Sequence, residues 1–140
     1  MEYDFKKFVE AQKISYEIAL EEIREGQKIS HWIWFIFPQL KILGHSSTAK
    51  YYGISDLDEA RAYLENETLR KNLLEISQEL LNLPESDIKK IMGYPDDLKL
   101  KSSMTLFELA DPGSEVFKKV LEKYFGGIRD EKTVAFCKNS

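Results

Sequence analysis

Apolar residues recur at steps of three and four positions through most of this chain, and that spacing limits the possible fold more than any other feature. Between residues 5 and 23 the repeat places Phe8, Tyr16 and Leu20 on one helix face, with Glu and Lys residues between them. The same spacing returns at Leu69 and Leu73 and continues to residue 80. The pattern predicts an all-α protein.

Residues that start and stop helices divide the chain into pieces. Helix starts are expected at Asp4, Ser46 or Ser47, Ser55, Asn66, Ser86 or Asp87, Pro95, Ser114 and Asp130. Stops are expected at Gly26, Gly53, Gly93, residues 111–113 and Gly126–Gly127. Because no Pro/Gly-rich linker separates the pieces, we expect residues 1–140 to form a single-domain multihelical array of about seven to eight helices.

The segment from Ile29 to Leu43 fits neither a helix period nor a strand period cleanly. Apolar residues fill nearly every position from Trp32 to Phe37. Aromatic and β-branched residues favour a strand, and Pro38 would then stand at its end. Because the neighbouring segments are helical, we expect a buried helical turn here.

Charge and cysteine content exclude several classes of protein. Twenty basic and 24 acidic residues give a net charge of −4, and the lysines are scattered rather than gathered on one face. Nucleic acid is therefore not an expected partner. The lone Cys137 cannot form an internal disulfide, and no Cys or His spacing predicts a zinc site. We therefore expect a cytoplasmic domain without metal or cofactor. We also expect it to be soluble, because no apolar run is long enough to span a membrane.

Two stretches carry polar groups that an ordinary helix does not need. The first runs from Ser30 to Gln39 and sets His31 and Gln39 beside Trp32 and Trp34. Aromatic walls with a few polar groups are typical of small-ligand pockets. A core segment whose Trp and His nitrogens bond to the backbone would have the same composition, and this alternative stays open.

The second stretch runs from Gly93 to Thr105 and combines two carboxylates, two lysines and three hydroxyls. Lys99 lies three or four residues from Ser102 and Ser103, so these side chains share a helix face that could hold a phosphate or carboxylate. Asp96 and Asp97 could equally serve the helix N-terminus, with the remaining polar groups solvated. A nucleophilic set can be written from His31, one of Asp96 or Asp97, and Ser102 or Ser103, but no G-x-S-x-G elbow surrounds either serine.

At these two stretches the chain resembles the DUF1810 family, small bacterial domains of uncharacterised function. The match covers almost the whole chain in order. It rests on Phe8-Val9-x-Ala11-Gln12, His31-Trp32-x-Trp34-Phe35-x-Phe37-Pro38-Gln39-Leu40, Leu43-Gly44-x-Ser46, Ala60-Arg61-x-Tyr63-Leu64, Asp96-Asp97-x-Lys99-Leu100-x-Ser102-Ser103-Met104-Thr105-Leu106-Phe107 and Phe125-Gly126-Gly127. The resemblance implies a multihelical fold and brings no established activity.

A looser resemblance joins residues 63–93 to the central helices of the NADAR family, helical proteins that act on ADP-ribose-linked molecules. It has no motif of comparable specificity, and the site residues of that family cannot be placed in this sequence. It serves as an analogy only.

Two functional hypotheses follow. In the first, the two stretches meet around a small-molecule site for a nucleotide or an ADP-ribose-like compound. Its predicted ligand-binding residues are Trp32, Trp34, Gln39, Lys99, Ser102 and Thr105, and its predicted catalytic residues are His31, Asp97 and Ser103. In the second, the domain is a non-catalytic protein-interaction module and the same residues form a polar-networked core. Whether the chain is an enzyme, and its oligomeric state, stay open.

Overall fold

The computed structural model describes residues 3–138, and every regular element in that range is a helix. The elements are α1 (Lys6–Arg24), α2 (Ile33–Ile36), the 3₁₀ helix η1 (Lys41–Leu43), α3 (Ser47–Tyr51), α4 (Leu57–Glu65), α5 (Glu67–Asn82), α6 (Ile88–Met92), α7 (Asp96–Ala110), α8 (Glu115–Phe125) and α9 (Glu131–Lys138). The all-α prediction is confirmed. The described residues form nine α-helices rather than seven or eight, and three of the nine are only four or five residues long.

Most of the predicted helix ends are confirmed by backbone and capping geometry. Gly26 has a φ of 80°, and its N–H donates to the carbonyl of Ile23 while Gln27 N–H donates to that of Glu22. This is the Schellman arrangement expected where a helix stops at glycine. Two predicted starts are wrong by a residue. Phe5, not Asp4, is the N-cap of α1, while Asp4 Oδ1 accepts from Lys6 N–H. Asp56, not Ser55, caps α4 by accepting from Glu59 N–H, while Ser55 bonds to the Glu59 carboxylate.

Helix α2 is the buried helical turn that the sequence predicted for the Trp32–Phe37 segment. Ile33 and Ile36 are buried within it, and Trp34 is half-buried on its outer side. The chain then leaves α2 through Gln39, whose carbonyl accepts from Ile54 N–H at 2.9 Å, while Lys41 N–H donates to Ile54 O at 2.7 Å. This isolated parallel bridge fixes the segment after α2 against the segment after α3.

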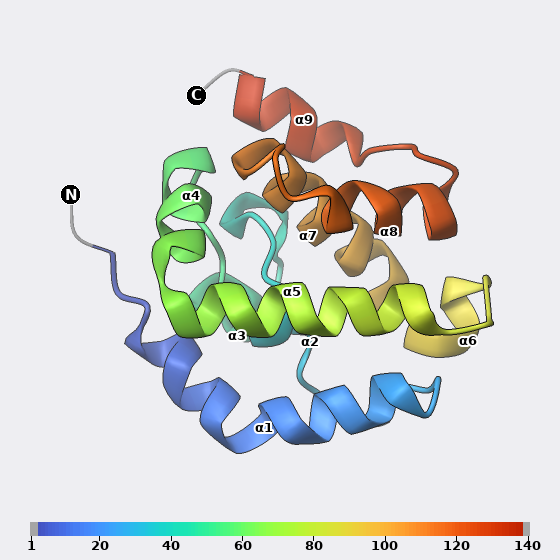
Figure 1. The fold of residues 1–140 in the computed structure, drawn as a ribbon. Helices are drawn as coiled ribbons and strands as arrows, with labels where there is room; N and C mark the ends of the chain where they lie inside the picture. The colour runs from blue at the N-terminus through green and yellow to red at the C-terminus, as the bar shows by residue number, and fades with distance from the viewer. Residues whose placement is uncertain (1–2, 139–140) are drawn as a thin grey trace.

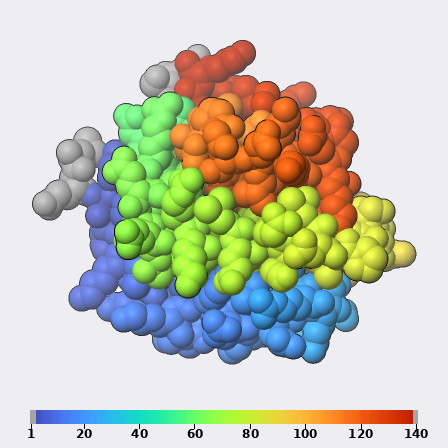
Figure 2. All heavy atoms as spheres, viewed as in Figure 1, coloured from blue at the N-terminus to red at the C-terminus, as the bar shows by residue number. Residues whose placement is uncertain are grey.

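Helix α7 runs through the middle of the fold and packs against α2, α4, α6, α8 and α9. Every residue from Ser102 to Glu108 is buried, which is expected of a helix that is enclosed on all sides. In Figure 1, α1, α5 and α8 lie side by side at the front, with α2 and α3 behind α5 and α9 across the top. The space-filling view shows α5 filling the front surface between α1 and α8 (Figure 2).

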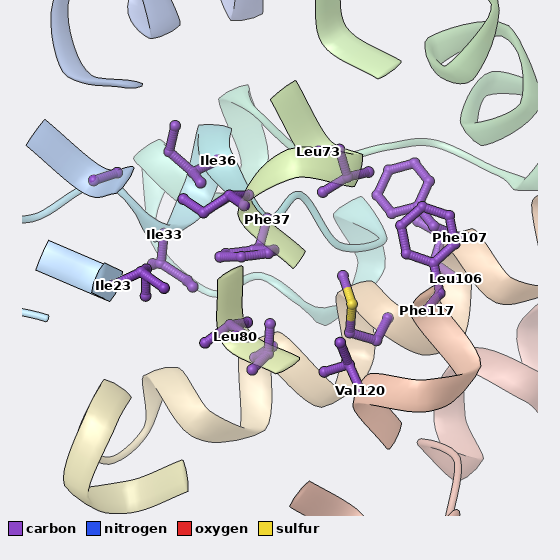
Figure 3. Packing of buried hydrophobic residues seen from close by; sticks show 14 of the residues in the cluster. Ile23, Ile33, Ile36, Phe37, Leu73, Leu80, Leu106, Phe107, Phe117 and Val120 are labelled. Atoms are coloured by element: carbon purple, nitrogen blue, oxygen red, sulfur yellow. The ribbon is translucent and has the colours of Figure 1, made fainter. Parts of the chain in front are cut away.

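One hydrophobic core joins these helices. Figure 3 shows Ile23 of α1 with Ile33 and Phe37 around α2, facing Leu80 of α5. Phe107 and Phe117 extend the same cluster toward α8, with ring centroids 6.0 Å apart. The core therefore holds the start of α7 beside α2, which sets the position of the candidate site.

Candidate functional site

A small hollow lies between α2, α3 and α7, and it contains residues from both stretches that the sequence singled out. Trp34 and Gln39 come from the first stretch, and Lys99 comes from the second. The cavity volume is about 10 Å³, close to the space that one water molecule needs. The wall is formed by Ile33, Trp34, Phe37, Gln39, Ala49, Tyr52 and Lys99.

The Lys99 side chain covers the aromatic wall of this hollow. Its Nζ lies 5.6 Å from the centroid of the Trp34 ring, within the range of a cation–π contact. The same Nζ lies 3.5 Å from Asp96 Oδ1. Because Lys99 has a flexible stem and is partly exposed, its ammonium can exchange these partners for a ligand without disturbing the core.

A buried ion pair extends this network. Lys28 Nζ lies 2.8 Å from Asp96 Oδ2, and only 6% of the Lys28 side chain is exposed. The Lys28 ammonium also donates to Ser30 O at 2.6 Å and lies 4.9 Å from the Trp32 ring centroid. Two lysines thus share the Asp96 carboxylate, and Lys99 is the more exposed of the two, so its ammonium is the one that an anionic ligand at the hollow can reach.

The turn that leads into α2 is held by the carboxylate of Glu22. It accepts hydrogen bonds from the backbone N–H groups of Ile29 and Ser30, from Ser30 Oγ, and from Trp32 Nε1 at 2.9 Å. Burial raises the pKa of Glu22, but the hydrogen bonds from Ser30, Ile29 and Trp32 outweigh it and bring the pKa down to about 2. Glu22 therefore orients the segment that presents Trp34.

The three predicted hydroxyl groups of α7 do not line the hollow. Ser102 Oγ donates to Leu98 O, and Thr105 Oγ1 donates to Lys101 O while accepting from Asp130 N–H. Ser103 is fully buried, and its hydroxyl has no hydrogen-bond partner among the described residues. These side chains are buried in this structure, so they do not form the solvated helix face that the alternative interpretation of this stretch described.

The other predicted residues are spread over different surroundings. Trp32 is 1% exposed and its indole nitrogen is bonded to Glu22, so it packs in the core. His31 is exposed beside the turn. Asp97 is buried on a different side of α7, where it lines a groove with α6 and α8. Within residues 3–138, no hydrogen bond joins His31, Asp97 and Ser103, and the catalytic trio stays a prediction.

Sequence reasoning missed Glu22, Lys28 and Tyr52. In the sequence, Glu22 and Lys28 resemble ordinary surface charges on α1 and the loop after it. Tyr52 resembles the last residue of a short helix. A signal was available for Glu22, since it lies beside the apolar face of α1 and one helix turn before a polar loop.

Neither metal binding nor membrane insertion gains support from the described part of the chain. No group of three or more His, Cys, Asp or Glu side chains in residues 3–138 is placed to hold a metal ion. No helix in the same range is both long and apolar enough to cross a bilayer.

Comparisons with known proteins identify relatives without an assigned activity. The family described as "Protein of unknown function (DUF1810)" matches residues 2–137. The chain is similar to the conserved hypothetical protein Rv1873 from Mycobacterium tuberculosis, whose crystal structure is known. The two sequences are 46% identical, and the two structures superpose with a TM-score of 0.95 over 97% of each chain. No curated protein matched the sequence.

Proposed function

Because the chain belongs to the DUF1810 family, whose description names no activity, we propose from the geometry alone that its hollow binds a small planar, anionic molecule of the nucleotide or ADP-ribose type. The observation that carries the proposal is the meeting of Trp34, Gln39 and Lys99 in one hollow. These residues come from segments some sixty positions apart in the sequence. Each supplies a different contact that a nucleotide needs.

The chemistry of each wall residue suits one part of such a ligand. The half-buried Trp34 ring offers a face for a base, and stacking of a base on an aromatic side chain contributes about 1–3 kcal/mol. The Gln39 amide can both donate to and accept from the edge of a base. The Lys99 ammonium, which is partly exposed, pairs with phosphate.

The small volume of the hollow indicates how the ligand enters. A cavity of about 10 Å³ cannot enclose a nucleotide. The Lys99 side chain must therefore swing away from the Trp34 ring, and the ligand's phosphate replaces the ring as its partner. The base then occupies the uncovered ring face at the mouth of the hollow.

Titration with AMP and with ADP-ribose, followed by tryptophan fluorescence, tests this function. We expect saturable quenching by both compounds, and weaker binding of adenosine because it lacks the phosphate. Lys99→Gln removes one charge-assisted contact and should weaken AMP binding about 10- to 100-fold. Trp34→Ala should weaken AMP and adenosine binding together, because both stack.

Lys71→Gln is the matched control, since Lys71 is an exposed lysine on α5 outside the hollow. It should bind AMP like the unaltered protein. No saturable signal with millimolar AMP or ADP-ribose would refute the function, and so would equal losses in Lys99→Gln and Lys71→Gln.

A protein-interaction role is the second candidate, and an apolar groove at α9 favours it. The groove has a volume of about 380 Å³ and includes Ile42, Leu43, Ala135 and Phe136. Ile42 is 64% exposed and lies in one groove with Leu43 and Phe136, so the exposed apolar surface is contiguous, as at protein-interaction sites. Ile42→Asp should abolish co-sedimentation with a partner while leaving AMP binding unchanged, and loss of AMP binding in this variant would contradict a separate surface.

A further inference from the structure

Asp97 is a carboxylate that the fold buries without giving it a partner. The residue is 2% exposed, and its Oδ1 atom has neither solvent contact nor a hydrogen-bond partner among the described residues. No Lys, Arg or His nitrogen in residues 3–138 lies within ion-pair distance of it. A buried carboxylate without a cation or hydrogen-bond donors is strongly unfavourable. The missing donor is therefore expected from outside the chain, and because Oδ1 is closed off from solvent, the Asp97 carboxyl must turn toward the adjoining groove to meet it.

A groove beside Asp97 has room for a ligand. It lies where α6 and the end of α8 meet the first turn of α7, at the right of Figure 1. Its volume of about 560 Å³ falls in the range of about 300–1,000 Å³ that is typical of small-molecule sites. Ser103, the other buried polar group without a partner, lines none of this groove and is sealed in the core.

The rest of the groove supplies complementary groups. Lys89 and Lys101 line it, and neither forms an ion pair within the described residues. Ile88 and Phe125 add apolar surface to the same wall. Asp87, the other carboxylate there, is occupied in capping α6 through a 3.0 Å bond to Lys89 N–H. The groove thus combines one carboxylate in need of a donor, two unpaired cations and an apolar patch.

We propose that the groove between α6, α7 and α8 binds a small zwitterionic amine, with its ammonium group on Asp97, its carboxylate on Lys101 or Lys89, and its apolar part against Ile88 and Phe125. A divalent cation fits less well, because Lys89 and Lys101 line the same groove and their charges oppose it. The proposal is independent of the hollow, since Asp97 and Lys99 lie about 200° apart around α7.

The first test uses Tm, measured by thermal unfolding, to find how much the unpartnered Asp97 carboxylate destabilises the folded protein. Asp97→Asn removes the buried charge but keeps the shape of the side chain. It should raise Tm by about 3 to 6 °C, since a site held ready for a ligand is destabilising in the free protein. Asp96→Asn, one residue earlier in the same helix turn, breaks the ion pairs to Lys28 and Lys99 and should lower Tm. A fall in Tm for Asp97→Asn like that of Asp96→Asn would overturn the proposal.

The second test uses three probes that share a phenyl ring, followed by amide chemical shifts in ¹⁵N NMR. L-phenylalanine carries both charges, 2-phenylethylamine lacks the carboxylate, and 3-phenylpropionate lacks the amine. We expect phenylalanine to bind most tightly and 3-phenylpropionate most weakly, with shifts at Ile88 and Lys101. Asp97→Asn should weaken phenylalanine and 2-phenylethylamine at least about tenfold. Lys101→Gln should instead weaken phenylalanine and 3-phenylpropionate, which carry the carboxylate, and leave 2-phenylethylamine unchanged.

Lys71→Gln is again the control and should leave all three affinities unchanged. Equal binding of 3-phenylpropionate and phenylalanine, or unchanged phenylalanine affinity in Asp97→Asn, would overturn the proposal. The proposal would also be overturned if about 20 mM phenylalanine caused no chemical-shift change at Ile88 and Lys101, since this concentration would detect even a Kd of about 20 mM. Because this measurement needs only the unaltered protein, it decides the matter even if Asp97→Asn fails to fold.

Discussion

Replacing Glu22 with glutamine removes the charge from the carboxylate that holds the turn before α2. The native carboxylate accepts four hydrogen bonds from Ile29, Ser30 and Trp32, and only 8% of the residue is exposed. Its pKa falls from the ordinary 4.5 to about 2. At about 1.4 kcal/mol for each pKa unit, this difference corresponds to about 3 kcal/mol of folding free energy at neutral pH.

The sign of the pH dependence follows from the lowered pKa. The stabilisation is fully present above pH 4.5 and is lost as the pH falls toward 2, where the carboxyl group is protonated in the folded protein too. Denaturant unfolding followed by far-UV circular dichroism should show Glu22→Gln less stable by about 3 kcal/mol at pH 7 and by about half as much at pH 3. The Tm at pH 7 should fall by about 10 °C.

Glu21→Gln provides the matched control, because Glu21 is the exposed neighbour on the same helix. It should change the free energy of unfolding by less than about 0.5 kcal/mol. Equal losses in the two variants, or a loss in Glu22→Gln that is the same at pH 7 and pH 3, would refute the account of Glu22 as a charged acceptor.

Two further predictions concern the frame of the hollow and the middle of α7. Gly53→Ala should destabilise the protein by about 1–3 kcal/mol and weaken AMP binding. The new Cβ would overlap the Lys41 backbone, next to the hydrogen bond between Ile54 N–H and Gln39 O. An unchanged Tm would contradict this. Ser103→Ala should leave the Tm unchanged or raise it, because the buried hydroxyl has no partner, so a fall in Tm would show that it has one.

The helices could be predicted from the sequence because their signals are local. The period of apolar residues and the stops at Gly26, Gly93 and Gly126 depend only on neighbours along the chain, and the structure confirms them. The cap of α4 was assigned to Ser55 instead of Asp56 because both residue types cap helices equally well. Local chemistry therefore fixed the elements to within a residue or two.

The site was less predictable, because its members are decided by packing. Trp32 and Trp34 lie in a run so apolar that no period separates an inner face from an outer one, yet one is buried against Glu22 and the other lines the hollow. Ser102 and Thr105 resembled ligand contacts, but each hydroxyl bonds to the carbonyl four residues earlier. The helix period alone places Asp97 and Lys99 on opposite sides of α7, but which helices face each side depends on the packing.

The position of α7 also restricts how the hollow at Lys99 and the groove at Asp97 could change over evolutionary time. Leu100 and the residues from Ser102 to Glu108 hold the helix in the core, while Asp97 and Lys99 project to opposite sides from its first turn. Inserting or deleting one residue before Leu100 would rotate that turn by about 100° and misdirect both side chains together. New ligand preferences at either surface must therefore arise by exchange of side chains, with the length of this turn held constant.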